Sequence, residues 1–368
     1  MFRGTSGIIM TTRAAIILAG GKARRFQLNQ EMWQDKALAQ LSDKHLLIHA
    51  VESVRNVVDE VAICVNDETR KSQYSRVLTQ YGIENIRLLT DEKIGDLGGP
   101  IVGIRTGLKS VKGDYCLTLP CDAPFLQPGA ANYMFNKVEG NRVVVPMWPD
   151  GRLETLIMVC ERLSIFEIVD VLCRLKRSRS DDIMRGASAV LFVSPIGELR
   201  TLDPDLKSFV NINSRDDLAR LQTRQIRGDI TENLSLCSKT LQPSELKLLR
   251  EASELQRKGE FFEASRVLSS CSEHLELEHL YFWAGISREN EGKNLFEWSR
   301  HQSSPEIARD GFLSGKIAIL KAAQNYELEA RDHETNQLIF LAGRARADKS
   351  WCQSRADDNW HSIRYLSR

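Results

Sequence analysis

The feature that most constrains the fold of this chain is an alternation of short apolar runs and amphipathic stretches between residues 13 and about 222. The apolar runs predict strands over Ala14–Leu18, Val61–Val65, Ile86–Leu89, Tyr115–Leu119, Val143–Pro146 and Leu156–Val159. The stretches between them have helical periodicity and predict helices over Leu46–Val58, Thr69–Tyr81, Ile101–Ser110, Gly129–Val138 and Leu163–Leu175. Such alternation is typical of a Rossmann-like α/β domain with a mostly parallel sheet, which binds ligands beyond the carboxyl ends of its strands.

The last third of the chain has a different pattern. Residues 223–242 are polar without a clear period and predict a linker, and residues 243–368 show helical patterns that predict an all-α domain. The stretch "LQRKGEFFEA", Leu255 to Ala264, has the spacing of a tetratricopeptide hairpin, so a tetratricopeptide-like domain is one alternative. Residues 1–12 precede the first strand and are interpreted as an N-terminal leader.

Composition excludes several classes of protein. A net charge of +1 over 368 residues gives no support to broad nucleic-acid or anionic-membrane binding. No apolar run approaches the roughly 20 residues needed to span a bilayer, and the N-terminus lacks the apolar core of a signal peptide. The eight cysteines include no C-x-x-C pair and lie mostly within apolar runs, which predicts reduced thiols and a cytoplasmic protein.

Two predicted strand ends carry opposite charges. The first strand runs into "LAGGKARRF", Leu18 to Phe26, where glycines and cationic side chains suit a phosphate, although a tight turn with solvated basic residues is the alternative. Asp122, in "LPCDAPFL", directly follows another strand; it could instead be a helix cap or turn residue before Pro124. One basic and one acidic strand end together suit a nucleotide with a divalent cation, because Mg²⁺ commonly binds one or two carboxylates plus substrate phosphates.

Four motifs in the same order extend this interpretation. "LAGGKARRF…DKAL", "LLTD…GGPIVGI", "LPCDAPFL" and "FVNINSRDDL" resemble those of the molybdenum cofactor guanylyltransferases over residues 13–222. The resemblance implies a nucleotidyltransferase that uses Mg²⁺ to transfer GMP from GTP to a phosphorylated pterin-type acceptor, molybdopterin, with release of pyrophosphate. An acceptor such as cobinamide phosphate or a sugar phosphate is an alternative, and so is a nucleotide-binding interaction protein whose helical tail docks a partner.

The resemblance also assigns residues to roles. Lys36, Arg25 and Asp122 are the implied catalytic residues, and Asp122 is the implied Mg²⁺ ligand. The implied nucleotide-binding residues are Leu18, Ala19, Gly20, Gly21, Asn66, Asp91, Asn211 and Asn213. Two positions depart from the family: Cys64 stands where relatives have an asparagine near the guanine, and the loop before Lys36 is longer.

Two further stretches carry expectations about the acceptor. "GRLETL", Gly151 to Leu156, resembles a segment near the acceptor in relatives, which makes Arg152 and Glu154 possible contacts, with a solvated turn as the alternative. "KRSRSDD", Lys176 to Asp182, predicts a solvated loop, with a phosphate-facing lid for the acceptor as the alternative. The helical tail either folds alone and contacts a protein partner, or packs on the front domain as a stabilising or dimerising cover.

Overall fold

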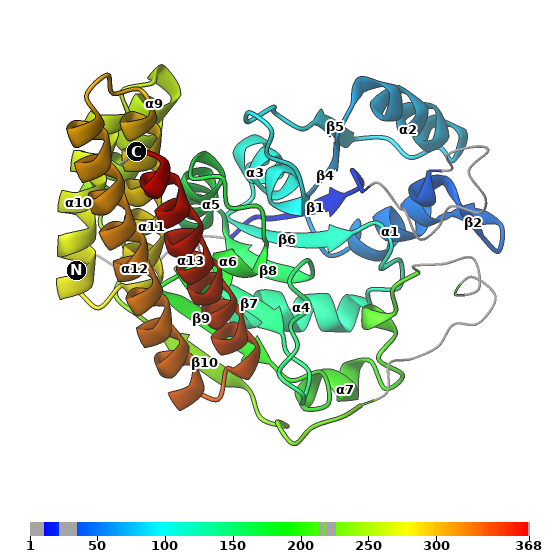
Figure 1. The fold of residues 1–368 in the computed structure, drawn as a ribbon. Coiled ribbons are helices and arrows are strands. Elements are labelled where there is room, and N and C mark those ends of the chain that lie inside the picture. The colour runs from blue at the N-terminus through cyan, green and yellow to red at the C-terminus, as the bar shows by residue number, and fades with distance from the viewer. Residues whose placement is uncertain (1–10, 22–34, 213–216, 218–225, 367–368) are drawn as a thin grey trace, which may run out of the picture.

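The protein is built around one eight-stranded sheet (Figure 1). The structure, a computed structural model, describes residues 11–21, 35–212, 217 and 226–366, with residues 359–366 described as backbone only. The strands are β1 (Arg13–Leu18), β4 (Glu60–Val65), β5 (Ile86–Thr90), β6 (Tyr115–Pro120), β7 (Val143–Pro146), β8 (Met158–Glu161), β9 (Ala189–Val193) and β10 (Leu234–Cys237). Their order is β10-β9-β7-β8-β6-β1-β4-β5, and only the pairs that involve β8 or β10 are antiparallel, which confirms the predicted mostly parallel α/β sheet.

The sheet is apolar on both faces because helices cover both of them. The flanking helices are α1 (Leu46–Val54), α2 (Glu68–Gln80), α3 (Pro100–Ser110), α4 (Pro128–Lys137) and α5 (Arg162–Arg174). Along β1, Ala14 and Ile16 belong to one buried cluster and Ala15 and Ile17 to the other, as the alternation of a strand requires. A continuous apolar run is therefore what a strand at the centre of this sheet needs.

Shorter elements connect or extend the sheet. They are η2 (Lys36–Leu38), β2 (Gln40–Leu41), β3 (Lys44–His45), α6 (Asp181–Gly186), α7 (Glu198–Leu202) and η3 (Lys207–Phe209). The strand β10 corrects the expected linker over residues 223–242, because Leu234–Cys237 pairs with β9 and completes the sheet. Four residues of alternating polarity are too short a pattern to stand out against the polar stretch around them.

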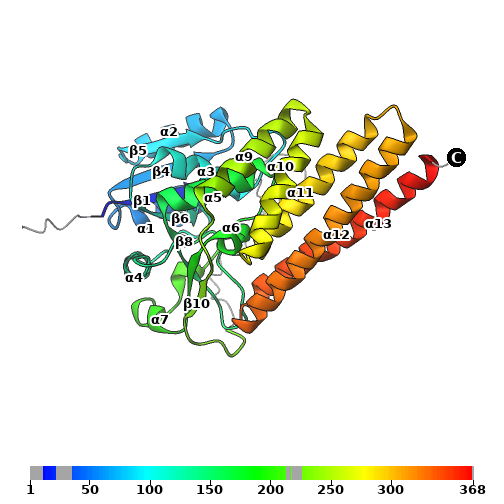
Figure 2. The ribbon, with the colours of Figure 1, turned by 90° about the vertical axis from the view of Figure 1, so that its left-hand side faces the viewer.

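Five helices follow the sheet (Figure 2). They are α9 (Pro243–Lys258), α10 (Phe261–Leu277), α11 (Tyr281–Arg300), α12 (Pro305–Thr335) and α13 (Ile339–Leu366). The helices α9 and α10 meet at Gly259, whose left-handed φ of 83° ends α9, and their lengths suit one tetratricopeptide hairpin. At 31 and 28 residues, α12 and α13 are each too long for a 34-residue helical-hairpin repeat. In the described part of the chain, none of the helices is both long and apolar enough to cross a membrane.

The helical region shares a core with the sheet domain. One buried cluster runs from Ile16 in β1 through α3 and α5 to Trp283 in α11 and Tyr326 in α12. The indole Nε1 of Trp283 donates a 3.0 Å hydrogen bond to the carbonyl of Gly186, and a Cβ at Gly186 would lie 2.8 Å from the same indole. Of the two expectations for the tail, the structure therefore shows the cover that packs on the front domain.

The segment Lys176–Asp182 lies within this interface, and the expectation of a solvated loop is wrong for half of it. Arg177, Asp181 and Asp182 have side chains no more than 12% exposed. Arg177 and Arg185 both bond Asp182, and both reach the Asp348 carboxylate of α13 at 2.7 Å. A buried charge needs partners of opposite sign, and Asp348, which both arginines share, stands more than 160 positions further along the chain, where no local pattern reveals it.

All eight cysteines are unpaired, and six of them are buried, as their apolar sequence surroundings predict. Burial raises the pKa of the Cys160 thiol, in the middle of the sheet, to about 12. Such thiols stay protonated and behave as small apolar side chains.

Candidate active site

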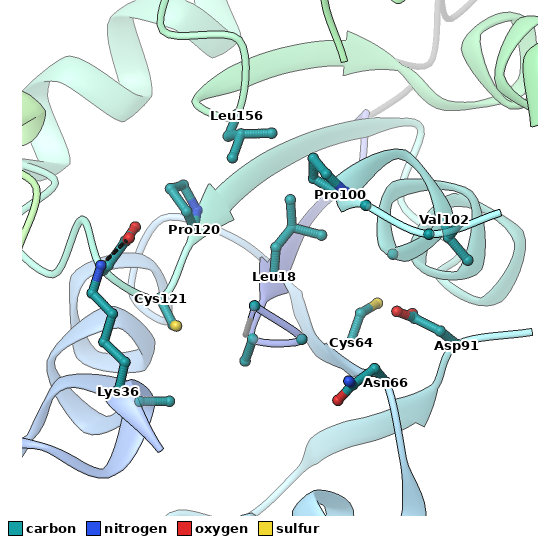
Figure 3. A pocket seen from close by; sticks show the side chains of 18 of the residues that line it. Leu18, Lys36, Cys64, Asn66, Asp91, Pro100, Val102, Pro120, Cys121 and Leu156 are labelled. Carbon is teal, nitrogen blue, oxygen red and sulfur yellow. Dashed lines mark hydrogen bonds and ion pairs between the residues drawn. The ribbon is translucent and has the colours of Figure 1, made fainter. Parts of the chain in front are cut away.

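A cavity of about 790 Å³ opens at the carboxyl ends of β1, β4, β5 and β6 (Figure 3). Its walls come from the Leu18–Gly21 loop after β1, from Asn66 after β4, from Asp91 after β5 and from Asp122 after β6. The N-terminal part of α3 and Leu156 close the remaining side. The volume and position are those of a small-molecule site in a parallel α/β sheet.

An ion pair marks one end of the cavity. Lys36 Nζ, on η2, lies 2.5 Å from Asp122 Oδ2, with side chains 12% and 26% exposed. The sequence predicted both residues for this site, and the structure brings them together from positions 86 residues apart. A half-buried lysine beside a carboxylate offers one group for phosphate oxygens and one for a cation.

Asp35 fixes the position of Lys36. Its carboxylate caps η2 by accepting a 3.0 Å hydrogen bond from the Ala37 N–H. It also accepts a 2.8 Å hydrogen bond from the Tyr74 hydroxyl and lies 3.3 Å from the Arg70 guanidinium, both on α2. Sequence reasoning did not single out Tyr74 or Arg70, and the signal for them is weak, because α2 is mostly polar and exposed.

The opposite end of the cavity carries polar groups suited to a base or sugar. The Asn66 amide oxygen accepts a 2.9 Å hydrogen bond from Arg70 Nη1, which leaves the amide nitrogen as the group that can donate to a ligand. The Asp91 carboxylate points toward the sulfur of Cys64, and its buried Oδ1 has no hydrogen-bond partner in the described part of the chain. Burial raises the pKa of Asp91 from 3.8 to about 6, against a smaller opposing effect of Thr106.

An unsatisfied buried carboxylate oxygen is costly, so a ligand that donates N–H or O–H groups to Asp91 would recover that cost. Space for such a ligand is left by glycines. A Cβ at Gly103 would lie 3.1 Å from Leu18 and 3.6 Å from Asp91 Oδ1, and one at Gly20 would lie 3.6 Å from Asp91 Oδ2. The sequence implied Gly20 and Asp91, whereas Gly103 emerges only from the packing of α3 against β1.

The other implied residues fall into three groups. Leu18, Ala19, Gly20 and Gly21 line the cavity. Asn211 lies next to the site without lining it: the N–H of its neighbour Ile212 donates a 2.8 Å hydrogen bond to the Asp122 carbonyl. Arg25 and Asn213 lie outside the described residues.

The "GRLETL" segment is a turn with its charges engaged. Glu154 accepts a 2.6 Å hydrogen bond from Trp148 Nε1, and Arg152 forms an ion pair with Asp150. Leu156 is the member of this segment that lines the cavity. Among the described residues, no group of three or more acidic, histidine or cysteine side chains is placed to hold a metal ion. A cation at Asp122 would therefore take most of its ligands from substrate oxygens and water.

Comparison with known proteins gives the family of the chain. Residues 15–187 match the family described as the MobA-like NTP transferase domain. A probable molybdenum cofactor guanylyltransferase from Methanosarcina mazei is 32% identical over 209 residues, which are 57% of this chain and 89% of the relative. The molybdenum cofactor guanylyltransferase of Desulfosudis oleivorans is 30% identical over 225 residues, 60% of this chain and the whole of the relative.

Among solved structures, the molybdopterin-guanine dinucleotide biosynthesis protein A of Archaeoglobus fulgidus is similar, with a TM-score of 0.46 and 21% identity, over 56% of this chain and 95% of that one. The fold and the sequence relatives define this protein as a nucleotidyltransferase. The chain belongs to the MobA-like NTP transferase family, together with enzymes named molybdenum cofactor guanylyltransferases. The matched residues end at 187, so the helical region lies beyond the family domain.

Proposed function

We propose that this chain transfers GMP from GTP to the terminal phosphate of molybdopterin and releases pyrophosphate. The observation that carries the proposal is the cavity, which has a lysine–carboxylate pair at one end and an unpartnered carboxylate oxygen at the other. The lysine–carboxylate pair suits a triphosphate with its cation, and the unpartnered carboxylate oxygen suits a base edge that presents several N–H groups. The names of the sequence relatives support the choice of acceptor.

In the proposed reaction, an oxygen of the acceptor phosphate forms a bond to the α-phosphorus of GTP, and the bond from that phosphorus to the pyrophosphate oxygen breaks. An ionised phosphate is already a nucleophile, so the protein has no proton to remove. Its task is to hold two polyanions together and to stabilise the charge that moves onto the leaving pyrophosphate. Lys36 binds oxygens of the triphosphate, and Arg25 is proposed to assist it.

Asp122 is the residue proposed to hold Mg²⁺. The donor set fits: one carboxylate at a strand end, next to a cavity where substrate phosphates would supply further oxygen ligands. When bound, the ion neutralises phosphate charge at the reacting centre. Lys36 then exchanges its present partner Asp122 for phosphate oxygens, which keeps the lysine charge compensated in both states. Asp91 accepts N–H groups of the guanine, and Asn66 donates to the nucleoside.

The test is release of pyrophosphate by the full chain from GTP with Mg²⁺, with molybdopterin, cobinamide phosphate and a sugar phosphate as separate acceptors. Formation of the guanine dinucleotide with molybdopterin alone is the expected result. Turnover with another acceptor would reassign the substrate, and nucleotide binding without turnover of any acceptor would favour an interaction protein.

A further inference from the structure

The loop between α5 and α6 lies beside the cavity, although none of its residues is among those that line it. Ser178 touches a residue that lines the cavity, and Ser180 touches the neighbour of one. The Ser178 carbonyl oxygen packs on Gly99, where an ideal Cβ would lie only 3.2 Å from it and where φ is +100°. The Ser180 hydroxyl donates a 2.8 Å hydrogen bond to Thr155 Oγ1. Gly99 and Leu156, the residue after Thr155, both line the cavity, so Arg179 stands beside the cavity between these two contacts.

A second arginine reaches the same place from the helical region. Arg179 Nε and Arg344 Nε each donate a 2.9 Å hydrogen bond to the Asp181 carboxylate, one to each oxygen. The Asp181 side chain is 3% exposed, whereas Arg179 is 46% exposed and Arg344 is 23% exposed. The buried carboxylate of Asp181 thus binds two guanidinium groups that are each partly exposed to solvent.

This arginine pair, Arg179 with Arg344, carries uncompensated charge. Within residues 11–21, 35–212, 217 and 226–366, neither guanidinium has a hydrogen bond or ion pair besides the one to Asp181. Two positive groups therefore share one negative group. Arg152, in the neighbouring turn, forms an ion pair with Asp150. Guanidinium forks with spare N–H groups bind phosphate-like oxyanions in a bidentate manner.

The start of α13 lies against the turn that leads into Thr155. A Cβ on Gly151 would lie 3.7 Å from the Phe340 backbone nitrogen and 4.0 Å from the Ile339 Cβ. The position of Arg344, one turn further along α13, is thus set by contact with the segment that ends at the Leu156 wall. The same wall lies across the cavity from Asn66 and Cys64 in Figure 3.

We propose that the arginine pair is an anion subsite for the acceptor, and that the helical region completes it through Arg344. The ligand class is an oxyanion carried by the acceptor. This inference rests on the proposed function for the identity of the acceptor, but the anion site itself does not. It gives α13 a role in substrate recognition on a surface that the matched family domain, ending at residue 187, does not contain.

The experiment compares Arg179→Gln, Arg344→Gln and Arg344→Lys with a matched control, Arg346→Gln. Arg346 stands two positions further along α13 and forms a surface ion pair with Glu334, 45% and 39% exposed. Three quantities are measured on the full chain: the melting temperature, the affinity for GTP with Mg²⁺, and the KM for molybdopterin. Loss of a charged hydrogen-bond donor predicts an acceptor KM about tenfold higher or more in both glutamine variants, with GTP affinity unchanged.

Arg344→Lys keeps the charge but loses the fork, so its KM should lie between wild type and Arg344→Gln, while Arg346→Gln matches wild type. Because Arg179 is half exposed, its variant tests the site even if Arg344→Gln loses stability. An unchanged acceptor KM in Arg179→Gln overturns the proposal. So does a loss of GTP affinity, which would assign the pair to the nucleotide phosphates.

A second arm separates this proposal from the proposed function. Broadening of the phosphorus resonance of inorganic phosphate is measured with GTP present, without acceptor. Wild type and Lys36→Ala should broaden it, and Arg179→Gln and Arg344→Gln should not. Phosphate binding without molybdopterin turnover would refute the proposed function and support the anion subsite. Normal turnover of molybdopterin with equal broadening in all variants would refute the anion subsite and support the proposed function.

Discussion

Arg185 on α6 and Glu329 on α12 form a buried two-point ion pair, with Nε–Oε1 at 2.6 Å and Nη2–Oε2 at 2.8 Å. The side chains are 0% and 5% exposed, and 144 positions separate them in the chain. The pair joins the sheet domain to the helical region at a point where water cannot replace either partner. The two parts of the chain are therefore expected to unfold together.

Replacement of Glu329 by glutamine should lower the free energy of unfolding by about 3–5 kcal/mol, because it leaves the Arg185 guanidinium buried with one charge partner fewer. Glu334→Gln on the same helix is the control, since Glu334 pairs with Arg346 at the surface, where such pairs contribute about 0–1 kcal/mol. Urea denaturation of both variants measures the difference. Equal stability of the two would mean that the buried pair contributes no more than an exposed one.

A chain that ends at residue 242 should fail to fold as a soluble protein. It keeps β10 but exposes the apolar surface of α5 that α9 covers and that of α6 that α11 covers, and it removes both acidic partners of Arg185 on α12 and α13. Light scattering and far-UV circular dichroism check this. A monomeric, folded fragment would restore the alternative of an independent docking domain.

Lys36→Ala and Asp122→Ala should each lower kcat by roughly 10²–10³-fold, the usual effect of removing one electrostatic stabiliser of a transition state. The exposed pair Lys44–Glu52 provides the control, because Lys44→Ala removes a lysine–carboxylate contact 2.9 Å long that lies outside the cavity. Pyrophosphate release at saturating GTP measures kcat. Near-normal turnover in either site variant would refute the role given to that residue.

The cavity should prefer guanine. The Asp91 carboxylate can accept the N1–H and the 2-amino group of guanine, and adenine and cytosine do not present that pair of donors. Calorimetry with Mg²⁺ should show GTP binding roughly tenfold or more tighter than ATP or CTP, and Asp91→Asn should reduce this preference. A CTP preference in the wild type would contradict the guanylyl assignment.

The affinity for GTP should depend on pH through Asp91. Burial raises the pKa of this carboxyl to about 6 in the free protein, and N–H donors of the base favour the ionised form. Affinity should be constant above about pH 7 and fall by up to about tenfold per pH unit below 6, as protonation removes the acceptor. Comparison with Asp91→Asn at each pH cancels the titration of the nucleotide phosphates. Parallel curves for the two proteins would show that Asp91 does not contact the base.

The sequence predicted the six strands β1, β4, β5, β6, β7 and β8 of the sheet, but it missed β9 and β10. Each core strand is a run of buried apolar residues, so β1 and β4 were predicted to within a residue, and Lys36, Asp91 and Asp122 follow from motif and strand position. The residues that hold Lys36 in position could not be predicted from the sequence in this way. Tyr74 and Arg70 act through contacts to Asp35, 39 and 35 positions away, and nothing local to α2 signals them.

The helical region shows the same limit. The pattern of the sequence predicted helices there, but it did not show which of their charged residues are buried and which are exposed. Glu329 and Glu334 stand five positions apart on α12, yet one is buried in the interface and the other is on the surface. Only tertiary packing distinguishes them, which is also why "KRSRSDD" was interpreted as solvated.

The long-range partners of Arg185 also delay the completion of the buried ion pairs while the chain is being translated on the ribosome. When α6 leaves the exit tunnel, its arginine has no acidic partner on α12 or α13, because Glu329 and Asp348 leave the tunnel 144 and 163 residues after Arg185. At roughly 5–20 residues per second, that interval lasts roughly ten to thirty seconds. Early in this interval β10 and α9 are not yet made, so the sheet lacks its edge strand and the side of α5 that α9 covers is bare. The nascent chain must stay soluble through this wait, so a chaperone that binds exposed apolar segments at the ribosome is expected to determine the yield of folded protein in the cell.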